Sequence, residues 1–110
     1  MRVGRDGLLL LAAMSATTPA SADYTIMGAG LASCGTWTQD RKNRTIDEKQ
    51  IEQWVLGFLS GVGYTGGTKY NPLNGLDAPA ILVWVDNYCL ANPLKHLSEA
   101  AHGFIDAHPK

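Results

Sequence analysis

The 110-residue chain predicts a small all-α domain, a bundle of about four helices held together by one disulfide. Apolar residues recur at helical spacing, and no segment alternates apolar and polar residues as a half-buried strand does. Apolar residues make up 45% of the chain and charged residues 17%, which excludes a disordered, highly charged chain. The two cysteines, Cys34 and Cys89, allow one internal disulfide but no zinc ribbon.

Residues 1–22 have the features of an export signal peptide. Two arginines precede a short apolar stretch, and the Ala-Ser-Ala tripeptide at 20–22 matches the pattern that signal peptidase accepts. A buried N-terminal helix is the alternative, but Pro19 and the neighbouring threonines would interrupt it. We therefore expect a periplasmic or secreted protein. Its mature part, residues 23–110, is expected to be a single helical domain with a net charge of −2, because the leader removes two arginines and one aspartate from a chain of net charge −1.

Cys34 and Cys89 are expected to pair, because export places them in an oxidising compartment. Closing a loop of 55 residues would stabilise the fold by about 4 kcal/mol in the chain-entropy model. A domain of this size needs such a link, because it buries only about 60–65% of its unfolded surface. A free reactive thiol is the alternative, and it is disfavoured because no other cysteine competes for the pairing.

The first predicted helix spans residues 33–42 and carries Cys34, Trp37 and Arg41 at helical spacing.

The second predicted helix begins with Thr45-Ile46-Asp47-Glu48, a capping-box pattern. In that pattern the Thr45 hydroxyl accepts from the backbone of Glu48 and the Glu48 side chain reaches back. Each of Gly57 and Gly61 costs a helix about 1 kcal/mol relative to alanine, so we expect another helix to approach closely there. The apolar stripe has a period of 3.6 residues and consists of Ile51, Trp54, Val55, Phe58, Leu59 and Val62.

Residues 63–75 interrupt the helical pattern with a run rich in glycine and asparagine. Loops of this length without structure of their own are often functional, and Tyr64 and Tyr70 would then be aromatic anchors for a partner. The alternative is a helix connector whose tyrosines lie back on the core.

The third predicted helix starts near Asp77, a favourable N-cap residue, with Pro79 in its first turn. Asn92-Pro93 is expected to end it and to start the fourth helix, which runs to about His108. The stripe of the third helix consists of Ile81, Trp84, Val85 and Tyr88, with Cys89 adjoining. The stripe of the fourth consists of Leu94, Leu97, Ala101, Phe104 and Ile105.

Ser98, His102 and Asp106 have the composition of a serine triad, but they stack on one helix face at four-residue steps. A triad needs the base held between the nucleophile and the acid, beside an oxyanion hole. We therefore expect a solvated polar face with a His102–Asp106 pair. Glu48 and Glu52 form a carboxylate pair with no nucleophile nearby, and Glu48 is better explained as a cap. No catalytic residue emerges, so the protein is not expected to be an enzyme.

No cofactor or metal site is expected either. His96, His102 and His108 follow at steps of six residues, so they point to different sides of a helix. The glycine pairs within 61–67 lack the preceding strand and the lysine-serine ending of a phosphate loop.

The partner classes are narrowed by charge and hydropathy. A net charge of −1 gives no electrostatic footprint for nucleic acid, and no apolar run reaches the roughly 18 residues needed to span a bilayer. The remaining classes of partner are folded proteins and unfolded client proteins. Both a homodimer and a monomer fit the sequence. The candidate client- or partner-binding residues are Trp54, Phe58, Val62, Tyr64 and Tyr70.

Three motifs occur in order after the leader. Ser33-Cys34 opens a helix that carries Trp37, Trp54-Val55-Leu56-Gly57-Phe58 follows, and Ala78-Pro79-Ala80-Ile81-Leu82-Val83 leads to Cys89 and an amphipathic C-terminal helix. In this arrangement the chain resembles the HdeA/HdeB acid-stress proteins of the bacterial periplasm, over most of residues 33–108. The resemblance implies a small helical protein with one disulfide that acts as a non-catalytic, acid-responsive holdase.

A second resemblance involves Gly57-Phe58-Leu59-Ser60-Gly61, followed by Tyr88, Pro93 and Ala100-Ala101. These residues are similar to the Rap/Tai-type immunity proteins, which are helical periplasmic inhibitors of cell-wall amidase toxins. This resemblance implies a specific inhibitor that binds one secreted protein at neutral pH. The sequence by itself leaves both functions open.

Overall fold

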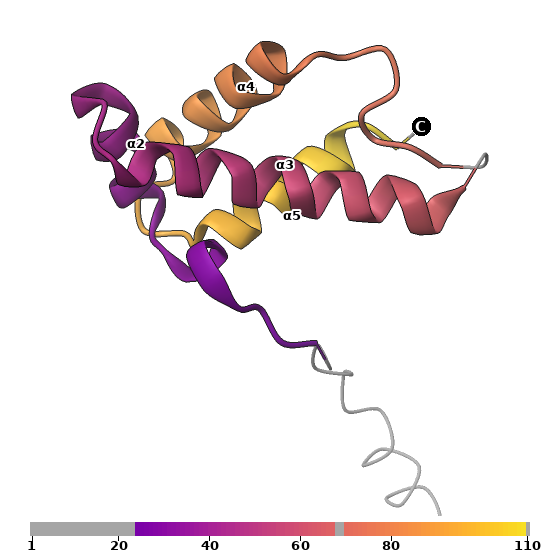
Figure 1. Ribbon diagram of the computed structural model, residues 1–110, viewed down its shortest axis with the longest axis horizontal. Coiled ribbons are helices and arrows are strands. Elements are labelled where there is room, and N and C mark those ends of the chain that lie inside the picture. The colour runs from indigo at the N-terminus through magenta and orange to yellow at the C-terminus, as the bar shows by residue number, and fades with distance from the viewer. Residues whose placement is uncertain (1–23, 68–69, 110) are drawn as a thin grey trace, which may run out of the picture.

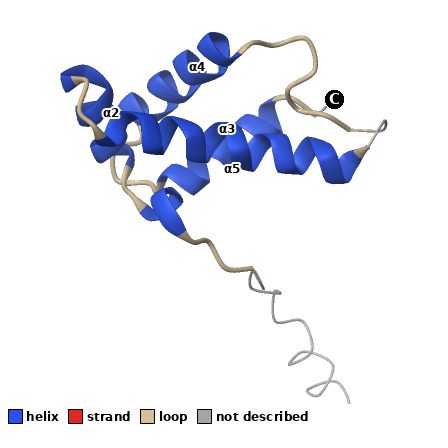
Figure 2. Cartoon of the chain, viewed as in Figure 1, coloured by secondary structure: helices blue, strands red, loops and turns tan. Residues whose placement is uncertain are grey.

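The computed structural model describes residues 24–67 and 70–109. Within these two ranges the chain is helical and forms no strand (Figure 2). The all-α bundle of about four helices is therefore confirmed, whereas the expected signal peptide at 1–22 lies outside the described residues. The elements are a short 3-10 helix, η1 (Gly28–Leu31), and the α-helices α2 (Cys34–Asn43), α3 (Asp47–Gly66), α4 (Ala78–Ala91) and α5 (Leu97–Ala107).

The four α-helices pack around one apolar core. In Figure 1, α3 and α5 lie side by side, and α2 meets the end of α4 at one end of the bundle. The 3-10 helix η1 contacts both α3 and α5. The largest fully buried apolar side chains are Trp37, Val55, Leu59, Val85, Leu97 and Phe104.

The predicted disulfide is present and joins Cys34, at the start of α2, to Cys89, near the end of α4. Both cysteines are completely buried, and no free cysteine occurs in the described residues. The bond therefore fixes α2 against α4 through the core.

The predicted helix starts near Ser33 and Asp77 are confirmed; Asp77 is the expected N-cap residue, and Ser33 is the N-cap of α2 rather than its first residue. The Ser33 side chain accepts a hydrogen bond from the Thr36 backbone N–H at 3.1 Å. At the start of α4, Asp77 Oδ1 accepts from the Ala80 backbone N–H, also at 3.1 Å. Each cap satisfies a backbone donor that the first helical turn leaves without a partner.

The expected capping box at Thr45 is wrong. The Glu48 backbone N–H donates to the Thr45 carbonyl oxygen instead, and the Thr45 hydroxyl is buried without a hydrogen-bond partner. The Glu48 carboxylate lies 3.8 Å from an Arg41 nitrogen. A buried carboxylate gains more from a guanidinium than from one backbone N–H, which explains why Glu48 turns inward.

Helix α3 extends to Gly66, beyond the expected end at Val62, and so shortens the connection to α4. Gly63 and Gly66 lie directly against Asn71 and Tyr70 of the returning chain, where a larger side chain would collide or crowd. The close approach of a helix expected at Gly57 and Gly61 does not occur, because a methyl group at either position would meet open space.

Helix α5 begins at Leu97 rather than at the expected Pro93. The intervening residues pair with the chain before α2: the Leu97 N–H donates to the Ala32 carbonyl oxygen, and the Cys34 N–H donates to the Lys95 carbonyl oxygen, both at 2.7 Å. These bonds hold the turn out of helical conformation. Leu94 consequently lies on the surface, 94% exposed, rather than on the apolar face of the fourth helix.

Candidate functional site

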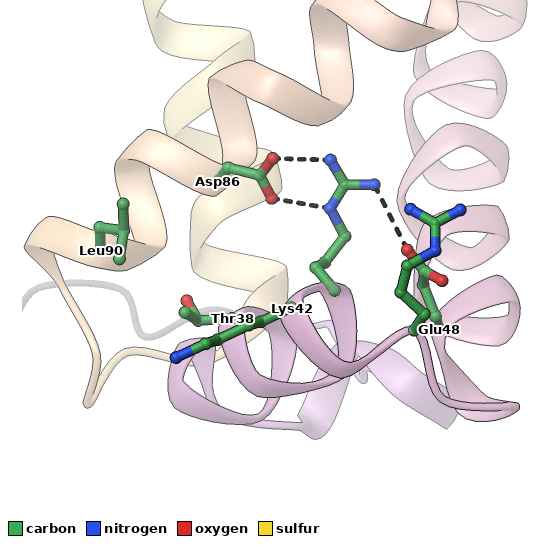
Figure 3. A pocket seen from close by; sticks show the side chains of 7 residues that line it. Thr38, Lys42, Glu48, Asp86 and Leu90 are labelled. Carbon is green, nitrogen blue, oxygen red and sulfur yellow. Dashed lines mark hydrogen bonds and ion pairs between the residues drawn. The ribbon is translucent and has the colours of Figure 1, made fainter.

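The most connected polar cluster of the described residues surrounds Arg41, where α2, α3 and α4 meet. Nε and Nη2 of Arg41 donate to the two carboxylate oxygens of Asp86, at 2.8 and 2.6 Å. Nη1 donates to Glu52 at 2.8 Å and lies 3.8 Å from Glu48. Figure 3 shows Asp86 and Glu48 on opposite sides of the pocket, with dashed lines that mark hydrogen bonds and ion pairs among the residues that line it. One cation of α2 is thus shared by carboxylates of α3 and α4.

The two glutamates of the cluster are held away from solvent, whereas Arg41 and Asp86 are partly exposed. The side chains of Glu48 and Glu52 are each only 6% exposed, and that of Arg41 is 21% exposed. Removing charges from water is costly unless they are paired with good geometry, and the paired Asp86–Arg41 fork meets that requirement. Arg41 is therefore paired directly with two carboxylates, those of Asp86 and Glu52.

The pKa directions agree with this geometry. The hydrogen bond to Asp86 is the main cause that raises the pKa of Arg41, against the opposing effect of burial. Burial pushes the pKa of Glu52 upward, but the hydrogen bonds from Arg41 and Lys49 more than offset it, so the pKa is lowered. Glu52 is thus stabilised as a carboxylate, and Arg41 as a guanidinium.

Trp37 connects the cluster to the core. Its Nε1 donates to Asp86 at 2.7 Å, and the Arg41 guanidinium carbon lies 5.4 Å from the centre of its ring. The fully buried indole thereby satisfies its only polar group, as a buried tryptophan requires.

Sequence patterns do not reveal this cluster. They place Glu48 at a cap and Arg41 on a helix, and they give Glu52 no partner. The available signal was Asp86, a single acidic residue within the apolar segment of α4, together with the carboxylate pair on α3. Their common partner lies 45 residues from Asp86, so helical spacing does not reveal it.

The candidate client-binding residues Trp54 and Phe58 lie together on α3. Their rings stack with centres 5.2 Å apart. The N-terminal segment packs against them: Trp54 Nε1 donates to the Met27 carbonyl oxygen at 2.9 Å, and Gly30 lies directly on the indole. Both aromatic side chains are half-buried, so this part of the stripe is partly covered in the folded protein.

The other three candidate residues differ in their exposure. Val62 is half-buried, and the Tyr70 hydroxyl donates to the Ile105 carbonyl oxygen at 3.3 Å, so Tyr70 lies back on α5. Tyr64, on the last turn of α3, is 87% exposed. Of the two tyrosines that were expected in a loop, only Tyr64 is exposed on the surface, where a partner could contact it.

The expected polar face of α5 is partly wrong. Ser98 is buried rather than solvated, and no His102–Asp106 ion pair forms among the described residues. The His102 ring instead makes edge contacts with Phe58 at 5.6 Å and with Tyr24 at 5.5 Å. His102 is therefore a packing residue beneath the N-terminal segment.

The remaining histidines have local structural roles. The backbone N–H of His96 donates to Glu99 at 3.0 Å at the start of α5. The His108 ring stacks on Phe104, with centres 4.1 Å apart. In residues 24–67 and 70–109, no group of three or more histidine, cysteine or acidic side chains is arranged to hold a metal ion.

The comparisons with known proteins found no relatives. No protein-family model, no curated protein and no solved structure matches the chain. Within the part of the chain that the structure describes, no helix combines the length and the apolar character needed to cross a membrane.

Proposed function

We propose that this chain is a non-catalytic, acid-responsive holdase that works in the periplasm or another extracytoplasmic compartment. The observation that carries the proposal is the Arg41 cluster, in which two buried carboxylates of α3 and the partly exposed Asp86 of α4 hold α2 in place. The Cys34–Cys89 disulfide supports an oxidising location.

Acid removes the charges on which the cluster depends. Glu52 contributes stability while it is ionised, and this contribution is lost as the pH falls through its lowered pKa. Protonated carboxylates leave Arg41 as an unpaired, partly buried cation, which opposes the packing of α3 against α2 and α4. Full protonation of residues 23–110 also raises their net charge from −2 to about +10, so that self-repulsion loosens the bundle further.

The disulfide determines which helices can separate from one another in acid. It keeps α2 attached to α4 in acid, whereas no disulfide holds α3, which is fixed by ion pairs, apolar packing and the Trp54–Met27 hydrogen bond. Release of α3 exposes its buried stripe of Ile51, Val55 and Leu59 together with the adjoining Trp54 and Phe58. An apolar surface of this kind binds unfolded clients without requiring a specific sequence.

The proposal is tested by light scattering of an acid-labile enzyme, such as malate dehydrogenase, below about pH 3. The protein is expected to suppress client aggregation there and to have no effect at neutral pH. The double variant E52Q/D86N, which mimics the protonated cluster, should bind the dye ANS at a higher pH than the wild type. The matched control is D106N on exposed Asp106 of α5. Unchanged client scattering in acid would refute the holdase function.

A second function, specific inhibition of a secreted amidase toxin, is favoured by one observation. Tyr64 is 87% exposed at the end of α3, where it is available as an aromatic anchor at neutral pH. Such an inhibitor would bind one partner stoichiometrically at neutral pH, and Y64A would weaken the complex by at least about tenfold. If no stoichiometric partner is recovered from periplasm, this function is excluded.

A further inference from the structure

A groove runs along α4 on the side that faces α2 and the start of α3, and the Arg41 cluster lines part of it. It consists of four adjoining hollows of about 230, 320, 360 and 450 Å³. Neighbouring hollows share lining residues, and the series extends from Pro79 at the first turn of α4 to Lys95 beyond its end. Thr38 and Lys42 of α2 form the opposite wall of the central hollows.

The groove exposes aliphatic side chains along its length. Val83 is 53% exposed, Leu90 is 64% exposed, and Leu94 is almost fully exposed. Val83 and Leu90 are seven residues apart, so they lie on the same side of α4. Figure 3 shows Leu90 beside Thr38 and Lys42, on the far side of Asp86 from Glu48. A row of exposed aliphatic side chains in a concave surface is typical of a protein-binding site.

The charge of the groove is opposite to that of the rest of the molecule. Every lysine and arginine in residues 24–67 and 70–109 lines one of the four hollows, together with three carboxylates, which leaves an excess of two positive charges. The other described residues carry five carboxylates and no lysine or arginine. The lysines and arginines of the described residues are thus concentrated along this groove.

Two of these cations are free to meet a partner. Arg41 is occupied by Asp86 and Glu52, and Lys49 and Lys95 each lie within 4 Å of a glutamate. Lys42 and Arg44 have no carboxylate within ion-pair distance among the described residues. Both line the central hollow next to Leu90.

We propose that this α2–α4 groove binds an amphipathic helix of a protein partner that presents leucine-like side chains flanked by carboxylates. The 14 residues of α4 give a groove about 21 Å long at 1.5 Å per residue, which matches a partner helix of about four turns. The aliphatic side chains of the partner contact Val83, Leu90 and Leu94, and its carboxylates pair with Lys42 and Arg44. Charge complementarity selects an acidic helix, and the concave walls favour a helix over a flat membrane surface.

The experiment is an NMR titration of the disulfide-bonded protein at neutral pH. The probe is a 14-residue synthetic helical peptide with leucine and glutamate at helical spacing, and the comparison peptides carry glutamine or lysine in place of glutamate. The glutamate peptide should shift the amide resonances of Thr38, Lys42 and Leu90, and leave that of Tyr64 unchanged. The glutamine peptide should bind about tenfold more weakly, and the lysine peptide should not bind.

Variants of the groove give a second test. K42E and L90S should each weaken binding of the glutamate peptide by about tenfold, whereas L31S, a matched change of an exposed leucine on η1, should leave it within about twofold. Leu90 is largely exposed, so L90S is expected to fold, and thermal unfolding checks this.

The proposal is overturned if the glutamate peptide shifts no groove resonance, or if the lysine peptide binds equally well. It is also overturned if the groove resonances move on dilution without peptide, which would assign the groove to a second copy of the chain. Preferential binding to phosphatidylglycerol vesicles over the peptide would assign it to a membrane. Because the titration uses the folded protein at neutral pH, its outcome is independent of the acid aggregation assay.

Discussion

Trp37 and Asp86 are 49 residues apart in the sequence, and a 2.7 Å hydrogen bond from the indole Nε1 to Oδ1 joins them. The same oxygen accepts from Nε of Arg41 at 2.8 Å. One carboxylate of α4 therefore satisfies both a buried indole and a guanidinium of α2. Together with the Cys34–Cys89 bond, this contact makes α2 and α4 a single unit against which α3 packs.

Replacing Asp86 by alanine should destabilise the protein by about 2–3 kcal/mol, because it leaves the Trp37 N–H and the Arg41 guanidinium without their shared acceptor. Urea unfolding at neutral pH measures this loss. The control is D106A, at the exposed Asp106 of α5, and its free energy of unfolding should stay within about 0.5 kcal/mol of that of the wild type. Equal unfolding midpoints for D86A and D106A would contradict the structural role of the cluster.

The free energy of unfolding should fall in acid partly because of Glu52. Its pKa in the folded protein is below the ordinary value of 4.5, so its contribution is complete above that value and is lost as the pH falls through the lowered pKa. The E52Q variant should be less stable at neutral pH, and its stability should decline less steeply below about pH 5. Urea unfolding at a series of pH values compares the slopes, with D106N as the control. Parallel curves for E52Q and the wild type would show that Glu52 is not part of the acid response.

The C34S/C89S double variant should lose about 4 kcal/mol of stability, because the bond closes a loop of 55 residues. Thermal or urea unfolding with and without a reductant measures the effect. Reductant should destabilise the wild type and leave the double variant unchanged. A reductant effect on both proteins would point to another cause of the instability.

Two glycine-to-alanine substitutions should have opposite effects on stability. A methyl group at Gly30 would overlap the Trp54 ring, so G30A should displace η1 and remove nuclear Overhauser contacts between η1 and Trp54. A methyl group at Gly57 meets open space, so G57A should stabilise α3 by about 1 kcal/mol. A stabilising effect of G30A would mean that η1 is not packed on the indole as described.

Arg44 ends α2 in the left-handed region, with φ of 56°, and it is the only described residue other than glycine with a positive φ. Glycine adopts this conformation without the Cβ conflict, so R44G should raise stability by about 0.5–1 kcal/mol. The same change removes a free cation of the α2–α4 groove and should weaken binding of the acidic peptide. Thermal unfolding and the NMR titration measure the two effects on the same variant. If R44G changed neither the unfolding temperature nor the affinity for the acidic peptide, the backbone strain at Arg44 would not affect stability and its charge would not affect binding.

Local patterns in the sequence determined the helices, and the cysteine content determined the disulfide that links α2 to α4. Ser33 and Asp77 are good N-cap residues wherever a helix follows them, and the spacing from Ile51 to Leu59 buries one side of α3 in any bundle. The disulfide could also be predicted from the sequence, because only two cysteines are present. The helix starts and the apolar stripe depend on residues that are close in the sequence, and the disulfide depends only on the number of cysteines.

Tertiary structure alone decided the features in which distant segments compete with local preferences. Glu48 turns away from the Thr45 cap toward Arg41, and residues 92–96 leave the helical conformation because their backbone pairs with the chain around Ala32 and Cys34. The convergence of Glu52 and Asp86 on one guanidinium, and the grouping of the cations along α4, follow from how α2, α3 and α4 are oriented. A sequence pattern reports which side of a helix is apolar, but the angle at which two helices meet depends on all the side chains between them.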